Sequence, residues 1–162
     1  MTPIASFEEV LEHAGCERRV IEHCRAVAGV ALTFTLKVPV NTELVLAGAW
    51  LHDIGRSKTH GIAHGQIGAD ICRELGYSER IARIVECHIG AGLTREECRR
   101  LGLEPRDCVP STLEEKIVAH ADNIVKDARE ISIDECIARA APLGPDVQKR
   151  LRDLADEIER LR

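Results

Sequence analysis

Apolar residues recur along most of the chain at the three- and four-residue spacing that is typical of amphipathic helices. In the segment 17–37, Val20, Ile21 and Val27 fall on one such stripe, and polar residues separate them. Pro39 interrupts the pattern, because proline lacks the backbone N–H that a helix interior needs. The spacing therefore predicts a long helix over residues 17–37.

Polar residues that cap helices stand where further helices would begin, and glycines stand where they would end. Serine, threonine and asparagine accept hydrogen bonds from first-turn N–H groups, whereas glycine readily adopts the left-handed conformation that ends a helix. Gly55 is accordingly expected to end, as a left-handed cap, a helix that begins at Asn41 or Thr42 and reaches Asp53. The remaining predicted helices are 6–15, 62–75, 78–88, 94–102, 111–125, one that opens at Ser132, and an amphipathic last helix over 145–162.

No segment shows a credible β-strand pattern, since the alternating residues 33–36 continue a helical pattern and end at Pro39. Aromatic residues make up only 2% of the chain, so a core must be built from leucine, isoleucine, valine and alanine, which suits packed helices. We therefore predict an all-α fold, a single compact helical domain of about seven to nine helices over residues 1–162.

Composition and charge narrow the functional class. The net charge of −5 argues against a general nucleic-acid binder. No stretch approaches the roughly 18–20 apolar residues of a membrane span, and no basic-then-apolar signal segment opens the chain. The seven cysteines are odd in number and contain no C-x-x-C pair, which is typical of a reducing compartment. These features predict a cytoplasmic protein without membrane contact.

Four polar residues occupy positions where a buried helix face would otherwise be apolar: His23, His52, Asp53 and Asp122. Burying an unpaired charge or imidazole costs several kcal/mol, so such residues need a partner. A divalent cation would satisfy all four, and a mixed nitrogen and oxygen donor set suits Fe, Mn, Co, Ni or Zn. The sequence therefore predicts a transition-metal site at these residues.

Two more histidines in the same part of the chain, His64 and His88, are candidates for a second ion. Asp53 would then be the natural bridging carboxylate, with two metals about 3.5–4 Å apart. The residues alone leave open whether one or two ions bind.

The ordered set His23, then His-Asp-Ile-Gly-Arg at 52–56, then Asp122, resembles the HD superfamily of metal-dependent phosphohydrolases. His64-Gly65 and the later His88 resemble the extended pattern of its two-metal members. The resemblance covers residues 18–128 and is closest to small HDIG-type proteins that resemble symmetrical diadenosine-tetraphosphate hydrolases.

The resemblance implies a helical enzyme that hydrolyses phosphoester or phosphoanhydride bonds, usually of nucleotides. By position, His23, His52, Asp53 and Asp122 would be ligands of a first metal. His64 and His88 would bind a second metal, or the substrate phosphate if only one ion is present. One departure from the family pattern is that Ile89 and Gly90 follow His88, where two-metal relatives often carry a further histidine.

Three residues beyond the HD pair are candidates for substrate contact. Arg56 and Lys58 could clamp a phosphate, and His60 could act as a general acid, because the pKa of histidine lies naturally close to neutrality. Asp53, Arg56 and His60 are thus the predicted catalytic residues. Arg56, Lys58, His60 and His64 are the predicted substrate-binding residues.

The predicted function is metal-activated hydrolysis of a phosphoester or phosphoanhydride in a nucleotide or similar small metabolite. A non-catalytic nucleotide sensor and a di-iron oxygenase on the same scaffold are the alternatives. Nucleic acid is an unlikely substrate because of the acidic charge, and a homodimer through the helix at 145–162 is compatible with the pattern.

Overall fold

Most helices begin at a residue whose side chain caps them. In the computed structural model, which describes residues 5–162, Asn41, Ser78 and Thr94 each accept a hydrogen bond from a first-turn N–H group. Thr94 and Glu97 complete a reciprocal capping box. Because these bonds satisfy donors that a helix leaves free, they fix where each element starts.

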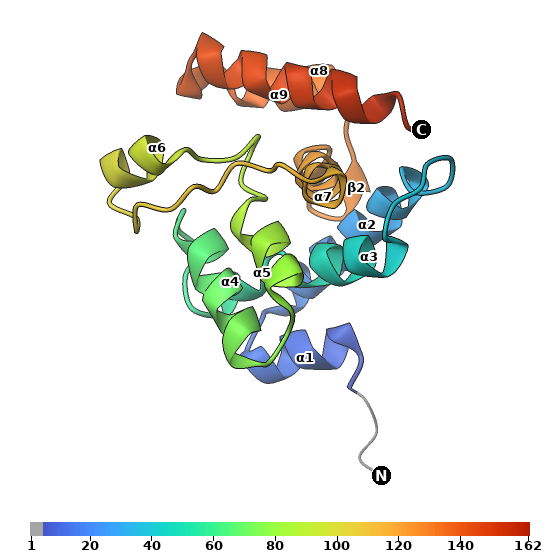
Figure 1. The fold of residues 1–162 in the computed structure, drawn as a ribbon, viewed down its shortest axis with the longest axis vertical. Coiled ribbons are helices and arrows are strands. Elements are labelled where there is room, and N and C mark those ends of the chain that lie inside the picture. Colours follow the sequence, from blue (N-terminus) through green and yellow to red (C-terminus); the bar gives the residue numbers. More distant parts are fainter. Residues whose placement is uncertain (1–4) are drawn as a thin grey trace.

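Residues 5–162 form nine α-helices, two short 3₁₀ helices and one small hairpin (Figure 1), which confirms the predicted all-α class. The α-helices are α1 (Phe7–Ala14), α2 (Arg18–Thr33), α3 (Thr42–Leu51), α4 (His64–Glu74), α5 (Glu79–Glu86), α6 (Arg95–Arg100), α7 (Leu113–Asn123), α8 (Ile133–Arg139) and α9 (Pro145–Glu159). The 3₁₀ helices are η1 (Ile54–Ser57) and η2 (Ala141–Leu143), and the strands are β1 (Val125–Lys126) and β2 (Arg129–Glu130).

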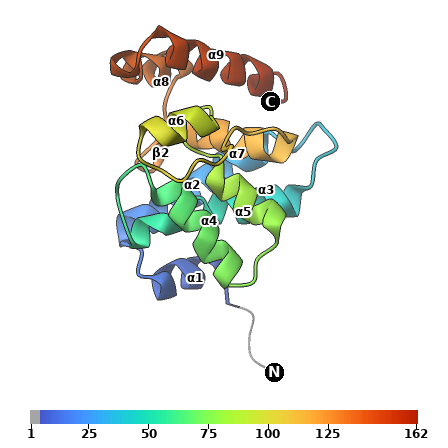
Figure 2. The same cartoon turned by 60° about the vertical axis from the view of Figure 1, so that its left-hand side comes forward.

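The helices stack along one direction, with α1 at one end, α8 and α9 at the other, and α7 between them (Figures 1 and 2). Two apolar clusters hold this arrangement together. The larger joins α2, α3, α7 and α9 through residues such as Val45, Ile117 and Ile158. The smaller joins α1 to α5 and includes Leu11 and Leu51. Because α3 contributes to both clusters, the residues that follow it are held firmly in place.

The long helix ends earlier than its hydrophobic pattern predicts. The structure ends α2 at Thr33, not near residue 37. The hydroxyl of Thr33 donates to the Val30 carbonyl oxygen and that of Thr35 to the Leu32 carbonyl oxygen. These side chains compete for the backbone acceptors that a further helical turn would use, so the helix stops.

Gly55 does not serve as a left-handed cap, and that prediction is wrong. The helix α3 ends at Leu51, and Gly55 lies inside η1 and does not have a positive φ. A Cβ atom at Gly55 would lie 1.9 Å from the carbonyl oxygen of His64. Glycine is required here because two backbone segments touch, and this contact brings the start of α4 against the residues that follow α3.

Two predictions for this region are also wrong: that the chain contains no strand, and that a helix runs to residue 125. The helix α7 ends at Asn123, and β1 pairs with β2 in an antiparallel hairpin. Asp127 makes the turn with a φ of 57°, a left-handed conformation that aspartate tolerates better than most residues. Two-residue strands are too short to show an alternating pattern, so periodicity could not reveal them.

The expected single domain over 1–162 stays a prediction, and its first four residues lie outside the described range. Within residues 5–162, no helix has the length and apolar character needed to cross a membrane.

Candidate metal centre

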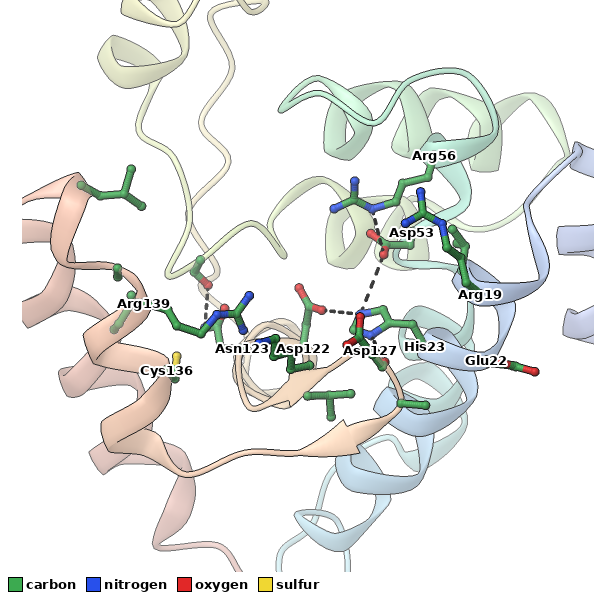
Figure 3. Close-up of a pocket in the computed structure, with 18 residues that line it drawn as sticks. Arg19, Glu22, His23, Asp53, Arg56, Asp122, Asn123, Asp127, Cys136 and Arg139 are labelled. Atoms are coloured by element: carbon green, nitrogen blue, oxygen red, sulfur yellow. Dashed lines mark hydrogen bonds and ion pairs between the residues drawn. The ribbon is translucent and has the colours of Figure 1, made fainter.

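Six predicted ligand residues converge from five separate parts of the fold. They are His23 of α2, His52 and Asp53 directly after α3, His64 at the start of α4, His88 just after α5, and Asp122 near the end of α7. Figure 3 shows three of them, His23, Asp53 and Asp122, with their polar atoms turned toward one another. The fold therefore assembles one site from residues that are far apart in the sequence.

The first group of donors surrounds Asp122. Its Oδ1 lies 2.9 Å from Nε2 of His23 and 3.3 Å from Nε2 of His52. The Oδ2 atom of Asp53 is 3.8 Å from the former nitrogen and 3.6 Å from the latter. Two imidazoles and two carboxylates thus share one small volume.

The second group lies on the other side of Asp53. Its Oδ1 is 3.2 Å from Nε2 of His64 and 3.4 Å from Nε2 of His88, and these two nitrogens are 3.0 Å apart. Asp53 therefore directs one carboxylate oxygen toward each pair of histidines. This is the arrangement expected of a carboxylate that bridges two positions.

All four histidines are oriented in the same way, by a backbone carbonyl oxygen next to Nδ1. The Nδ1 contacts are His23 to Asp127 at 2.7 Å, His52 to Ala49 at 2.6 Å, His64 to Gly61 at 2.8 Å and His88 to Val85 at 2.6 Å. Donation from Nδ1–H fixes the tautomer and leaves the Nε2 lone pair facing the centre of the site, as in histidines that bind metals.

The site fits a divalent transition metal on structural grounds. Nε2 of His52 is buried and has no hydrogen-bond partner among residues 5–162, although an unsatisfied buried nitrogen is costly. The facing Nε2 atoms of His64 and His88 would repel each other unless a proton or a cation lay between them. The mixed nitrogen and oxygen donors match the preference of Fe, Mn, Co, Ni and Zn.

The ionisation of the buried groups is strongly coupled. Burial raises the pKa of Asp53, but the charge of His52 and hydrogen bonds from His64 and His88 together hold it well below its usual value. Burial lowers the pKa of His52, and the charges of Asp53 and Asp122 outweigh that effect and raise it. Burial lowers the pKa of His88. Protons and metal ions therefore compete for the same positions beside the carboxylates.

An open cavity of about 540 Å³ leads to this centre, and cationic side chains line it. Arg19, Arg56 and Arg139 surround it in Figure 3, and Lys126 belongs to the same wall. Nε of Arg56 donates to Oδ2 of Asp53 at 3.1 Å. Of these cations only Arg56 was predicted from the sequence. Arg19 comes from α2, whereas the hairpin and α8 bring Lys126 and Arg139 to the cavity from distant segments.

Two predicted substrate-binding residues lie elsewhere. Lys58 lines a different hollow beside His13 and Ser57. Nε2 of His60 is 3.3 Å from the Glu17 carboxylate, and His60 is not one of the residues that line the metal cavity. The structure therefore gives no support to a phosphate clamp at Lys58 or a general acid at His60.

The domain is helical and holds two adjoining groups of histidine and aspartate donors, of which His23, Asp53 and Asp122 line an open cavity that also carries cationic side chains. This combination is typical of the class of helical metal-dependent phosphohydrolases. The chain belongs to the HD domain family, whose model matches residues 20–127. The predicted recognition of that family is thereby confirmed, and the motif region at 18–128 stays a prediction. The finer resemblance to diadenosine-tetraphosphate hydrolases stays a prediction.

Relatives of the chain carry different names. It is 49% identical over 155 residues to an uncharacterized protein of Methanocaldococcus jannaschii, covering 90% of this chain and 91% of that protein. It is 42% identical over 152 residues to a tRNA (cytidine(56)-2'-O)-methyltransferase of Picrophilus torridus, covering 94% of this chain and 43% of that protein. The chain thus spans less than half of the methyltransferase. A Ribonuclease Y of Cutibacterium acnes is 31% identical over 74 residues, which are 44% of this chain and 14% of that protein.

Among solved structures, the HD domain of the Listeria monocytogenes phosphodiesterase PgpH superposes with a TM-score of 0.61 at 18% identity, covering 93% of this chain and 95% of that one. The same domain in complex with cyclic-di-AMP also has a TM-score of 0.61, again at 18% identity, with coverage of 91% and 92%. At this level of identity the likeness establishes the shared fold.

Proposed function

We propose that the protein is a metal-dependent phosphohydrolase that cleaves a phosphoester or phosphoanhydride bond of a nucleotide or similar small phosphorylated metabolite. The observation that carries this proposal is the position of Asp53. Its two oxygens face two separate pairs of histidine Nε2 atoms, and the group opens into a cavity with four cationic side chains. Divalent metals and anionic phosphate would meet at this point.

The two donor groups would hold the metal, His23, His52 and Asp122 in one and His64 and His88 in the other, with Asp53 shared. When bound there, such ions lower the pKa of water and neutralise charge on a phosphoryl group. The role of the chain is to present Nε2 lone pairs and carboxylate oxygens in a fixed arrangement. Backbone carbonyl oxygens at Nδ1 supply that rigidity.

Arg56 has two tasks in this proposal. Its Nε holds Oδ2 of Asp53, and its Nη1 donates to the carbonyl oxygen of His60 at 3.1 Å, so the guanidinium is positioned from both sides. With Arg19 and Arg139 it would bind non-bridging phosphate oxygens, because guanidinium groups match phosphate geometry. These charges also stabilise the additional negative charge that develops during hydrolysis.

RNA is a second candidate substrate. One relative that matches this chain is named as a tRNA methyltransferase and another as Ribonuclease Y. The nucleotides of RNA are joined by phosphodiester bonds, which are among the bonds that the proposed activity would cleave. The cavity is open enough to receive a chain end, whereas the net charge of −5 favours a small substrate over a long polyanion. A panel of nucleotides, cyclic dinucleotides, dinucleoside polyphosphates and short oligoribonucleotides separates these candidates.

The test combines metal analysis with activity. The purified wild-type protein, Asp53→Ala and the control Asp146→Ala, which alters an aspartate in the first turn of α9, are loaded with each candidate metal and assayed on this panel. We expect at least about one metal equivalent and hydrolysis in the wild type and control, and loss of both in Asp53→Ala.

A loaded wild type that cleaves no member of the panel would contradict the proposed hydrolase. Nucleotide binding without turnover would then support the sensor alternative. Oxygen consumption by a di-iron form would support the oxygenase alternative.

A further inference from the structure

An apolar groove of about 310 Å³ lies between the turn at 89–93, α6 and the start of α9. Ile62, Leu101 and Leu143 line the groove, and 39%, 47% and 69% of their respective surfaces are exposed to solvent. Three of the five exposed large hydrophobic residues within 5–162 thus gather at one groove. Apolar residues that are exposed singly are ordinary, whereas ones that gather in a groove are a common feature of ligand-binding sites.

The groove is continuous with the metal cavity. Gly90 and Leu143 line both of them. The side chain of Asn123 donates to the carbonyl oxygen of Gly90 at 3.0 Å, and Asn123 directly follows the ligand residue Asp122. The shared wall is therefore tied to the metal centre, so a molecule in the groove would lie at a fixed position relative to it.

The groove also has a polar end. Nη1 of Arg150 donates to both carboxylate oxygens of Glu97 at 2.9 Å, and its Nη2 donates to the Gly92 carbonyl oxygen at 2.6 Å. Arg100 lies beside this pair, is exposed, and forms no ion pair within residues 5–162. Aliphatic walls with a charged end fit a flat group that has apolar faces and a polar edge. Arg150 and Glu97 are already paired, so Arg100 is the group left to bind a ligand, and a hydrocarbon chain would offer it no acceptor.

We propose that this groove binds the nucleoside part of a nucleotide whose phosphate lies in the metal cavity. The inference rests on the proposed function and narrows its substrate class. The base lies between Leu101 and Val147 with its edge toward Arg100, and the path from groove to metal passes over Gly90. The volume of the groove, about 310 Å³, lies within the range of about 300–1,000 Å³ that is typical of small-molecule pockets.

Variants of the groove test this proposal. Val147→Trp fills the space and Leu101→Ser removes one apolar wall. The matched control Leu75→Ser alters an exposed leucine at the C-terminal end of α4. It lines a separate hollow and is not one of the residues that line the metal cavity. For the metal-loaded protein, kcat/KM is measured with bis(p-nitrophenyl) phosphate and with the nucleotide cleaved fastest. Binding of adenosine, guanosine, cytidine and uridine monophosphates is measured by calorimetry, and thermal melting confirms folding.

We expect both groove variants to lower the ratio of nucleotide to bis(p-nitrophenyl) phosphate kcat/KM at least tenfold, through KM, and to weaken nucleotide binding at least tenfold. The control should change neither value. Unchanged ratios and affinities in both folded groove variants would overturn the proposal, as would tighter binding of dodecyl phosphate than of every nucleotide.

Failure of the proposed function gives a different result. If the wild type cleaves no phosphodiester, the activity ratio has no meaning but the calorimetry still decides. Nucleotide binding that the groove variants lose would support the groove in a non-hydrolytic protein, whereas equal binding by wild type and variants would reject it.

Discussion

At the residue scale, a candidate metal ligand differs from an ordinary buried polar group in whether its polar atoms already have partners within the protein. His120 is as buried as His88, but its Nε2 lies 3.0 Å from the Glu159 carboxylate and its ring packs against Phe34. His52, in contrast, has a buried Nε2 without a hydrogen bond. The first histidine is satisfied by the protein, whereas Nε2 of the second faces carboxylate oxygens at 3.3 and 3.6 Å, an arrangement that a metal ion would fit.

His52 lies in the first donor group, and one of its donor atoms is also within 4.8 Å of donor atoms of Asp53 and His88, so its loss should affect the whole centre. We expect His52→Ala to abolish stable metal binding and to lower kcat/KM at least about 100-fold, since even residues that only orient metal ligands contribute about 10- to 100-fold. His60→Ala is the matched control and should retain its metal and remain within about threefold of wild-type activity. Elemental analysis and steady-state kinetics measure both effects.

Comparable losses in the two variants would contradict this assignment. A loss confined to His60→Ala would instead restore His60 as the general acid that the sequence suggested.

Residue identity and order predicted the centre well. The positions of His23, His52, Asp53 and Asp122 among apolar residues indicated burial, and the structure brings all four together. Lys58 was chosen for its nearness to Asp53 in the sequence, and His60 for that nearness and for the near-neutral pKa of histidine. Nearness in the sequence is not nearness in space here, because Lys58 lines a different hollow and His60 contacts Glu17.

At the scale of the elements, the close contact between η1 and α4 positions the second histidine pair. A Cβ atom at Gly55 would meet backbone atoms, which cannot swing aside as the end of a side chain can. We expect Gly55→Ala to lower the free energy of unfolding by at least about 3 kcal/mol, because overpacking against backbone forces the segments apart. Urea denaturation measures the change.

Gly29 provides the matched control. It lies within α2, and an added Cβ atom would meet nothing within 4 Å. Gly29→Ala should therefore raise the free energy of unfolding by about 0.5–1 kcal/mol, since alanine favours a helix more than glycine does. Destabilisation by Gly29→Ala, or tolerance of Gly55→Ala, would contradict this account of the two glycines.

Helix starts could be predicted from the sequence more accurately than helix ends. Ser78, Thr94 and Ser132 cap helices where the sequence placed them, because an N-cap is a local bond between neighbouring residues. The ends of α2 and α3 depend on threonine side-chain bonds and on a contact with a distant segment. The turn at Asp127 depends likewise on its pairing partners, which periodicity does not record.

At the scale of the whole molecule, the metal centre connects α2, α3, α4, α5 and α7. An ion that binds the folded state and not the unfolded chain stabilises by mass action, by about 2.7 kcal/mol when free metal is 100 times Kd. We therefore expect chelation to lower the unfolding midpoint of the wild type, and added metal to restore it. Calorimetric melting measures both steps.

The Asp53→Ala variant distinguishes specific binding from a general effect of salt. Its unfolding midpoint should not respond to chelator or metal, because the shared ligand is missing. An equal response in variant and wild type would show that the stabilising ion binds elsewhere.

The cavity and the groove could not be predicted from the sequence. The cavity depends on where α8, η2 and α9 lie over the rest of the fold, and the groove depends on where η2 and α9 lie. The cations of the cavity come from α2, η1, β1 and α8. Charged residues on a solvated face have the same sequence pattern whether they surround a cavity or not. Only the packing of the helices makes the difference visible.

The distance along the chain between the ligands has a consequence for how the protein acquires its metal. His23 and Asp122 are 99 residues apart, and the backbone oxygen that orients His23 is 104 residues away. Contacts of such long sequence separation close late in folding, because the entropy of closing the loop must first be overcome. The donors of the first group therefore meet only once α2 and α7 have come together, so the unfolded chain offers the ion no assembled centre.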